Sequence, residues 1–166
     1  MNNKKKIVTI SVSVVILIFI VGIFILTRKD EEFTSTSIFD PADTAIYYED
    51  RAMQEEWGKD TIEILKGGKS TYNEYEDLKL KNSYTFETSQ AEMMQILNVV
   101  EESNFLFLKD EYIDPMIMDG EIEKLTITYG DQTKTVMIAN TYMEEFTRVV
   151  TELFKLVEKK TDAKVN

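Results

Sequence analysis

The stretch KLTITYGDQTKTVMI, Lys124 to Ile138, decides the fold of this chain. Apolar residues alternate with threonine and lysine on both arms, which is the period-two pattern of a half-buried strand. Gly130-Asp131 marks the turn between the arms. The stretch therefore predicts an antiparallel hairpin with one apolar face. The apolar positions are Leu125, Ile127, Tyr129, Val136 and Ile138.

An amphipathic helix is predicted on each side of the hairpin. Before it, Ser89 and Glu92 have the spacing of a capping box, and apolar residues follow at i, i+3, i+4 and i+7. After it, Thr141 and Glu144 repeat the capping-box spacing and open the last helix. The apolar stripes are Met93, Ile96, Leu97 and Val100 in the first helix, and Phe146, Val149, Val150, Leu153, Phe154 and Val157 in the second.

Strand patterns precede the first helix. They cover residues 44–50, residues 60–66 before Gly67-Gly68, and residues 72–87, which form one bent strand or two. After the first helix, FLFL at 105–108 is predicted to plug the core. This order predicts an α+β domain over residues 44–160, with an antiparallel sheet of four or five strands and two helices packed on one face.

The N-terminal stretch IVTISVSVVILIFIVGIFIL, residues 7–26, carries no charge and matches the hydrocarbon thickness of a bilayer. It is longer than the apolar part of a signal peptide, and no small-x-small cleavage site follows it directly. We expect a transmembrane helix at 7–27 that anchors the chain in the lipid bilayer. Lys4, Lys5 and Lys6 favour a cytoplasmic N-terminus at 1–6 and a domain outside the cell membrane. Residues 28–43 are predicted to be a polar linker, and 161–166 a tail.

Composition excludes several kinds of function. The chain carries 19 basic and 30 acidic residues, a net charge of −11, which disfavours nucleic acid as a partner. It has no histidine and no cysteine, so a Ser-His-Asp triad, a thiol nucleophile and a His-ligated metal are absent. No catalytic residue, cofactor site or metal site is predicted.

The sequence offers three kinds of candidate site. Residues 110–123 concentrate six carboxylates, but they do not fit the EF-hand spacing, and we interpret them as a solvated acidic loop. Ser70 beside Lys69 is interpreted as part of a turn rather than as a nucleophile with its base. Apolar residues in polar surroundings are the better candidates, because such side chains contact partners. The predicted partner contacts are Trp57, Met116, Ile117 and Met118.

The second half of the chain resembles known small domains in its layout. A capped helix runs into NFLFLKD (104–110), the hairpin KLTITYGDQTKTV follows, and TYMEEF (141–146) opens a second helix. This layout resembles uncharacterised archaeal and bacterial membrane-anchored α+β domains. It is also similar to emfourin-type inhibitors of metalloproteases. The resemblance covers about residues 89–157 and implies a binding or inhibitory module, with no functional residue carried over.

The sequence therefore predicts a non-enzymatic, single-pass membrane protein whose extracytoplasmic domain binds a protein partner at the cell envelope. One alternative is an inhibitor of an extracellular metalloprotease. Another is a small envelope hydrolase that uses paired carboxylates.

Overall fold

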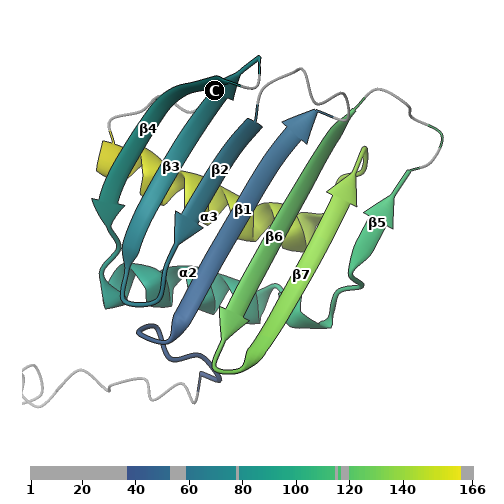
Figure 1. Ribbon diagram of the computed structural model, residues 1–166. Helices are drawn as coiled ribbons and strands as arrows, with labels where there is room; N and C mark the ends of the chain where they lie inside the picture. The colour runs from purple at the N-terminus through teal and green to yellow at the C-terminus, as the bar shows by residue number, and fades with distance from the viewer. Residues whose placement is uncertain (1–36, 53–58, 78, 115, 117–119, 162–166) are drawn as a thin grey trace, which may run out of the picture. The chain divides into compact units, whose positions relative to one another are not determined.

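The computed structural model describes residues 37–52, 59–77, 79–114, 116 and 120–161. These residues form an α+β fold of one mixed sheet and two long helices (Figure 1). The elements in chain order are β1 (Thr44–Ala52), β2 (Lys59–Ile64), β3 (Lys69–Glu76), β4 (Lys79–Glu87), α2 (Gln90–Glu102), the 3-10 turn η1 (Phe105–Phe107), β5 (Glu111–Ile113), β6 (Glu121–Tyr129), β7 (Gln132–Ala139) and α3 (Glu144–Thr161).

The sheet is larger than the sequence predicts. Within the described residues it has seven strands in the order β4-β3-β2-β1-β6-β7-β5, and the expectation of four or five antiparallel strands is wrong. Residues 72–87 supply two strands, because the chain reverses at Asp77 with a left-handed φ of 50°. The short β5 adds a seventh strand, which pairs with β7 in parallel.

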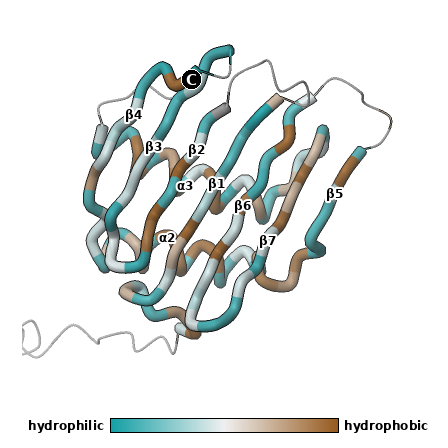
Figure 2. The backbone as a smooth tube through the Cα atoms, viewed as in Figure 1, coloured by the Kyte–Doolittle hydropathy of each residue, from teal (hydrophilic) through white to brown (hydrophobic). Residues whose placement is uncertain are grey.

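The helices α2 and α3 lie on the same face of the sheet, as predicted (Figure 1). Alternate residues of the strands point toward them, so that Tyr48 of β1 stands between Ile62 of β2 and Leu125 of β6. All three side chains are almost fully buried. Figure 2 shows hydrophobic and hydrophilic residues following one another along the strands, as expected for a sheet with one covered and one open face.

The first capping box is confirmed and the second is wrong. Ser89 caps α2, whose buried stripe is the predicted one. The last helix begins only at Glu144, and its first hydrogen bond runs from the amide of Thr147 to the carbonyl of Met143. Thr141 therefore precedes the helix as part of the crossing from β7 to the helix layer, and it does not act as the N-cap.

The apolar run at 105–108 is only partly a core plug. Phe105 is fully buried against Phe146, with ring centroids 6.3 Å apart, whereas Phe107 is 87% exposed. The run forms the 3-10 turn η1, whose three residues per turn point in different directions. Only Phe105 therefore enters the core completely, while Leu106 and Leu108 pack at its margin.

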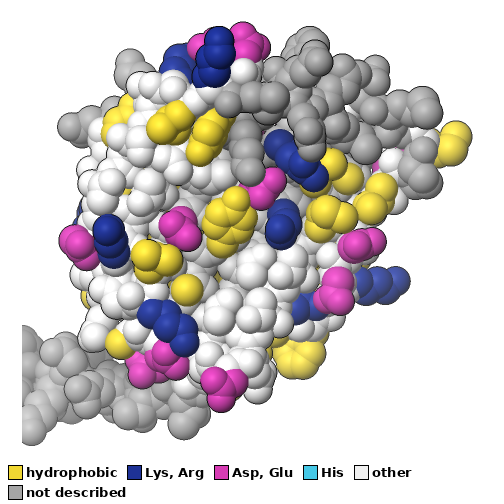
Figure 3. All heavy atoms as spheres, viewed as in Figure 1, with side chains coloured by type: hydrophobic (Ala, Val, Ile, Leu, Met, Phe, Trp, Pro, Cys, Tyr) yellow, Lys and Arg dark blue, Asp and Glu magenta, His cyan; other side chains and the backbone are white. Residues whose placement is uncertain are grey.

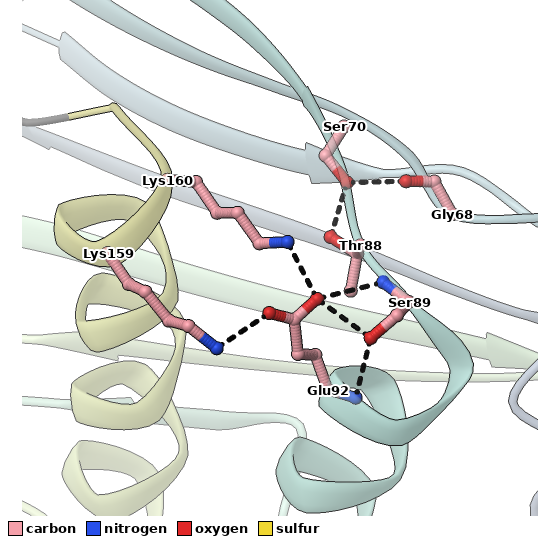
Figure 4. Close-up of polar contacts among 7 residues, drawn as sticks. All are labelled: Gly68, Ser70, Thr88, Ser89, Glu92, Lys159 and Lys160. Carbon is pink, nitrogen blue, oxygen red and sulfur yellow. Dashed lines mark hydrogen bonds and ion pairs between the residues drawn. The ribbon is translucent and has the colours of Figure 1, made fainter.

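Glu92 joins the start of α2 to the end of α3 (Figure 4). Its carboxylate accepts hydrogen bonds from the backbone amide of Ser89 at 2.9 Å, from Lys159 at 2.9 Å and from Lys160 at 2.8 Å. The two lysines hold the pKa of Glu92 well below its usual value, helped by the Ser89 amide. The capping box is thus also the contact that fixes the two antiparallel helices at this end.

Replacing Glu92 with glutamine is expected to destabilise the domain by about 1–2 kcal/mol at pH 7, because the charge shared with two lysines is lost. The lowered pKa gives stability above the ordinary pKa of the carboxyl, and this stability disappears as the pH falls through the folded value. Urea unfolding at pH 7 and pH 3 measures both effects. The matched control is Glu87→Gln on β4, an exposed carboxylate that should change little. Equal losses for the two variants at pH 7 would contradict the role of Glu92.

No helix among the described residues is long and apolar enough to cross a bilayer. The predicted transmembrane segment at 7–27 and most of the predicted linker at 28–43 lie outside those residues.

Candidate functional site

Four carboxylates stand next to one another across four neighbouring strands. Glu74 of β3 pairs with Asp60 of β2, Asp60 pairs with Asp50 of β1, and Asp50 pairs with Glu123 of β6. Each lies two residues from a buried core position, so all four are on the helix-facing side of the sheet. We call these residues the carboxylate row. Neighbouring strands are about 4.8 Å apart, so like charges in directly opposite positions repel one another.

Tyrosine hydroxyls donate hydrogen bonds to three members of the carboxylate row. Tyr48 donates to Glu123 at 3.0 Å, and Tyr72 donates to Asp60 at 3.3 Å and to Glu74 at 3.4 Å. Asp50 receives no hydrogen bond from the residues that the structure describes. The end of the row at Glu74 also accepts a hydrogen bond from the side-chain amide of Asn82.

Burial and mutual repulsion shift the acid strengths in the carboxylate row. Burial raises the pKa of Asp50 to about 7, and Glu123, Glu121 and Asp60 add to the effect. Burial also raises the pKa of Glu123 and of Asp60, while the hydrogen bonds from Tyr48 and Tyr72 oppose the rise. The pKa values of both tyrosines are raised by burial and by the same carboxylates.

Among the described residues, two surface cavities flank the carboxylate row. One, of about 330 Å³, lies between Asp50 and Asp60 and the second half of α3. The other, of about 540 Å³, lies beside Glu121 and Glu123. Residues from α3 on the first cavity are Val150, Thr151, Phe154, Lys155 and Glu158.

Chemically, this arrangement takes up a proton near neutral pH. An acid with a pKa of about 7 beside other carboxyl groups is the kind of group that general acid–base chemistry uses. Within the described ranges, no group of three or more acidic side chains has the geometry of a metal site. The carboxylate row was not predicted from the sequence, because its members come from four separate strands.

The open face of the sheet carries the second candidate surface. Ile113 of β5 pairs with Ala139 of β7, and Ala139 pairs with Ile122 of β6, which places an apolar line across three strands. Met137 lies two residues from Ala139 on the same face. Ile113 is 47% exposed, and Met116, just after β5, is 87% exposed. We call Ile113, Met116, Ile122 and Met137 the open-face patch.

Figure 3 views this open face directly. Hydrophobic side chains gather over β6, β7 and β5, with charged side chains beside them. Lys124 and Arg51 are among the cations on this face, since each lies one residue from a helix-facing position. The patch is therefore apolar at its centre and charged around it, as in many protein interfaces.

Of the predicted partner contacts, only Met116 falls among the described residues. It is strongly exposed, and its amide donates to the side chain of Asp114 at 2.9 Å. Trp57, Ile117 and Met118 lie outside those residues. The partner role of all four remains a prediction. Ile113, Ile122 and Met137 are not among the predicted contacts. Ile113 and Ile122 fall in the stretch interpreted as an acidic loop, and Met137 lies between the apolar positions of the predicted hairpin.

The predicted acidic loop at 110–123 is wrong as a single loop. Residues 111–113 form β5 and residues 121–123 begin β6. Asp110 forms an ion pair with Lys134, whose Nζ lies 2.7 Å from Oδ1 of Asp110. Glu123 belongs to the carboxylate row. Ser70, which follows Lys69, is buried; its hydroxyl is hydrogen-bonded to the hydroxyl of Thr88 at 2.7 Å and lies 2.9 Å from the carbonyl oxygen of Gly68. These contacts are those of a structural hydroxyl.

No protein-family profile matches the chain, and a search of curated proteins found no match either. Its function is therefore inferred from its own residues.

Proposed function

We propose that this chain is a non-enzymatic, membrane-tethered protein whose domain lies outside the cytoplasm and binds a protein partner. Residues 7–27 supply the tether, and the three lysines before them set the orientation. The open-face patch supplies the contact with the partner. Within the part of the chain that the structure describes, both helices lie on the other face of the sheet (Figure 1).

The observation that carries the proposal is the position of the open-face patch. Ile113 of β5 and Ile122 of β6 stand in line on either side of Ala139 of β7, and the paired strands hold them rigidly. Met116, just after the edge strand β5, is strongly exposed. Exposed apolar side chains that cluster on a rigid face commonly mark interaction sites. A preformed surface also costs little conformational entropy on binding.

Site-specific photo-crosslinking in intact membranes tests this proposal. A photoreactive amino acid is placed at Met137, inside the open-face patch, and at Thr85 of β4, which is exposed on the same face of the sheet. We expect a discrete adduct from position 137 and none from position 85. Adding Ile122→Asp to the Met137 probe should lower the adduct yield about fivefold or more, because an interface centre excludes charge.

Equal adducts from both positions, or no adduct from position 137, would remove the open-face patch as the docking surface. An adduct that Ile122→Asp leaves unchanged would point to chance collision and would count against the proposal in the same way.

A second candidate is a small hydrolase, favoured by the pair of carboxylates on one cavity. Asp50 and Asp60 both line the 330 Å³ cavity, and burial raises the pKa of Asp50 to about 7, a value suited to a general acid. Turnover of a panel of aryl glycosides by the full chain, abolished by Asp50→Asn, would support it. Absence of turnover across pH 5–8 would remove it. The inhibitor alternative has no comparable observation in its favour.

A further inference from the structure

We propose that the carboxylate row is a pH-sensitive device that holds α3 against the sheet in mildly acidic conditions and loosens it as the pH rises past neutrality. The proposal concerns the domain's own conformation and does not depend on which partner binds the open-face patch.

The carboxylate row lies directly beside the aromatic contact through which α3 packs on the sheet. The ring of Phe154 meets Tyr48 edge-on at 5.4 Å and Tyr72 edge-on at 6.3 Å. Phe154 also lines the 330 Å³ cavity together with Asp50 and Asp60. Charge at this end of the sheet therefore acts within one side chain's length of the aromatic cluster under α3.

The surroundings of Asp50 are acidic on nearly every side. Asp60 faces it from β2, Glu121 and Glu123 from β6, and the Tyr48 hydroxyl belongs to its own strand. From α3, Glu158 adds a further carboxylate to the cavity, and Lys155 is the cation. The ammonium group of Lys155 lies 2.6 Å from Glu152, so it is already paired on its own helix.

The protonation of Asp50 changes near neutral pH. Its pKa is raised from 3.8 to about 7 by burial first and by Glu123, Glu121 and Asp60 next. The chain contains no histidine, so no imidazole titrates between pH 5 and pH 8. A pH response in this window therefore points to the carboxylate row.

The direction of the response follows from linkage. Below pH 3.8 Asp50 is protonated in the folded and unfolded states alike, and its ionisation costs nothing. As the pH rises, the unfolded chain loses this proton first, so the folded state is progressively disfavoured until the pH passes about 7. Above that value Asp50 is charged in the folded state as well, water enters the cavity, and the end of α3 packs less firmly on the sheet.

Urea unfolding of the full chain in nonionic detergent micelles between pH 5 and pH 8 is the first test. We expect the wild-type midpoint to fall by about 0.5–1 M over this range, after allowance for the partial screening of a half-buried group. Asp50→Asn cannot ionise and should remove most of that fall. Glu63→Gln, an exposed carboxylate on β2, is the matched control and should retain it.

Hydrogen exchange at pH 8 locates the effect. Comparing wild type with Asp50→Asn at the same pH keeps the intrinsic exchange rates equal. We expect amides 150–158 of α3 to exchange several-fold faster in the wild type, while amides 90–100 of α2 exchange alike. A wild-type midpoint that does not change with pH, an unchanged fall in Asp50→Asn, or equal exchange in α3 would each overturn the proposal.

Discussion

Replacing Phe105 with alanine is expected to destabilise the domain by about 3–5 kcal/mol, the usual cost of removing a fully buried aromatic ring. Phe105 has no exposed surface and packs against Phe146, so its ring joins η1 to α3. The space that the ring leaves would not close, because Phe105 belongs to a core whose other side chains are held by the sheet and the helices. The change should appear as a lower urea midpoint with an unaltered slope.

The matched control stands two residues away in the same turn. Phe107 is 87% exposed, so Phe107→Ala removes the same atoms from water rather than from the core and should change stability by less than about 0.5 kcal/mol. A loss of stability for Phe107→Ala as large as that for Phe105→Ala would contradict the burial of Phe105 and the exposure of Phe107.

Replacing Gly68 with alanine is expected to cost about 3–4 kcal/mol, from backbone strain and a steric clash together. Gly68 has a φ of +92°, and an added Cβ would lie 2.2 Å from the carbonyl oxygen of Thr88. That backbone cannot move away freely, because the amide of Thr88 donates to the carbonyl of Gly68 at 2.8 Å. Figure 4 shows that Thr88 also leads into Ser89, the cap of α2.

Gly67→Ala separates the two causes. Gly67 has a similar φ of +83°, but nothing lies within 4 Å of an added Cβ. This variant should therefore lose about 1–2 kcal/mol, from strain alone. Comparison of the two midpoints by urea unfolding measures the clash. Equal losses would contradict the close approach of the β2–β3 turn to Thr88.

The elements that repeat a period were predictable from the sequence. Of the others, the division of residues 72–87 into two strands was left open, and β5 was missed. Alternation revealed β6 and β7, and spacing revealed both helices. β4 is an edge strand whose residues alternate in burial only near its end, and its separation from β3 depends on the left-handed Asp77. β5 is only three residues long and is held by its pairing with β7.

The start of α3 shows why a local motif can fail. Thr141 and Glu144 have the spacing of a capping box, but the chain leaves β7 through Asn140, whose φ is +56°. It then has to cross from the sheet to the helix layer before a helix can begin. The resulting start at Glu144 places Glu144 and Glu145 in the first turn, where acidic residues favour the helix dipole.

The carboxylate row could not be predicted because it depends on strand order and register. Asp50 and Glu123 are 73 positions apart, and β1 meets β6 only in the folded sheet. Individually, each acid looks like an ordinary solvated residue near a strand end. Register places four such residues side by side, and that arrangement produces the raised pKa of Asp50.

Single-cysteine labelling tests the central claim, that the domain is tethered with its fold outside the cytoplasm. The chain contains no cysteine, so a cysteine introduced at position 85 by Thr85→Cys, or at position 3 by Asn3→Cys, is the only thiol. Intact cells are treated with a membrane-impermeant maleimide. We predict that position 85, exposed on β4, is labelled in intact cells and that position 3 is labelled only after lysis. Protection of position 85 until lysis would contradict the proposed location.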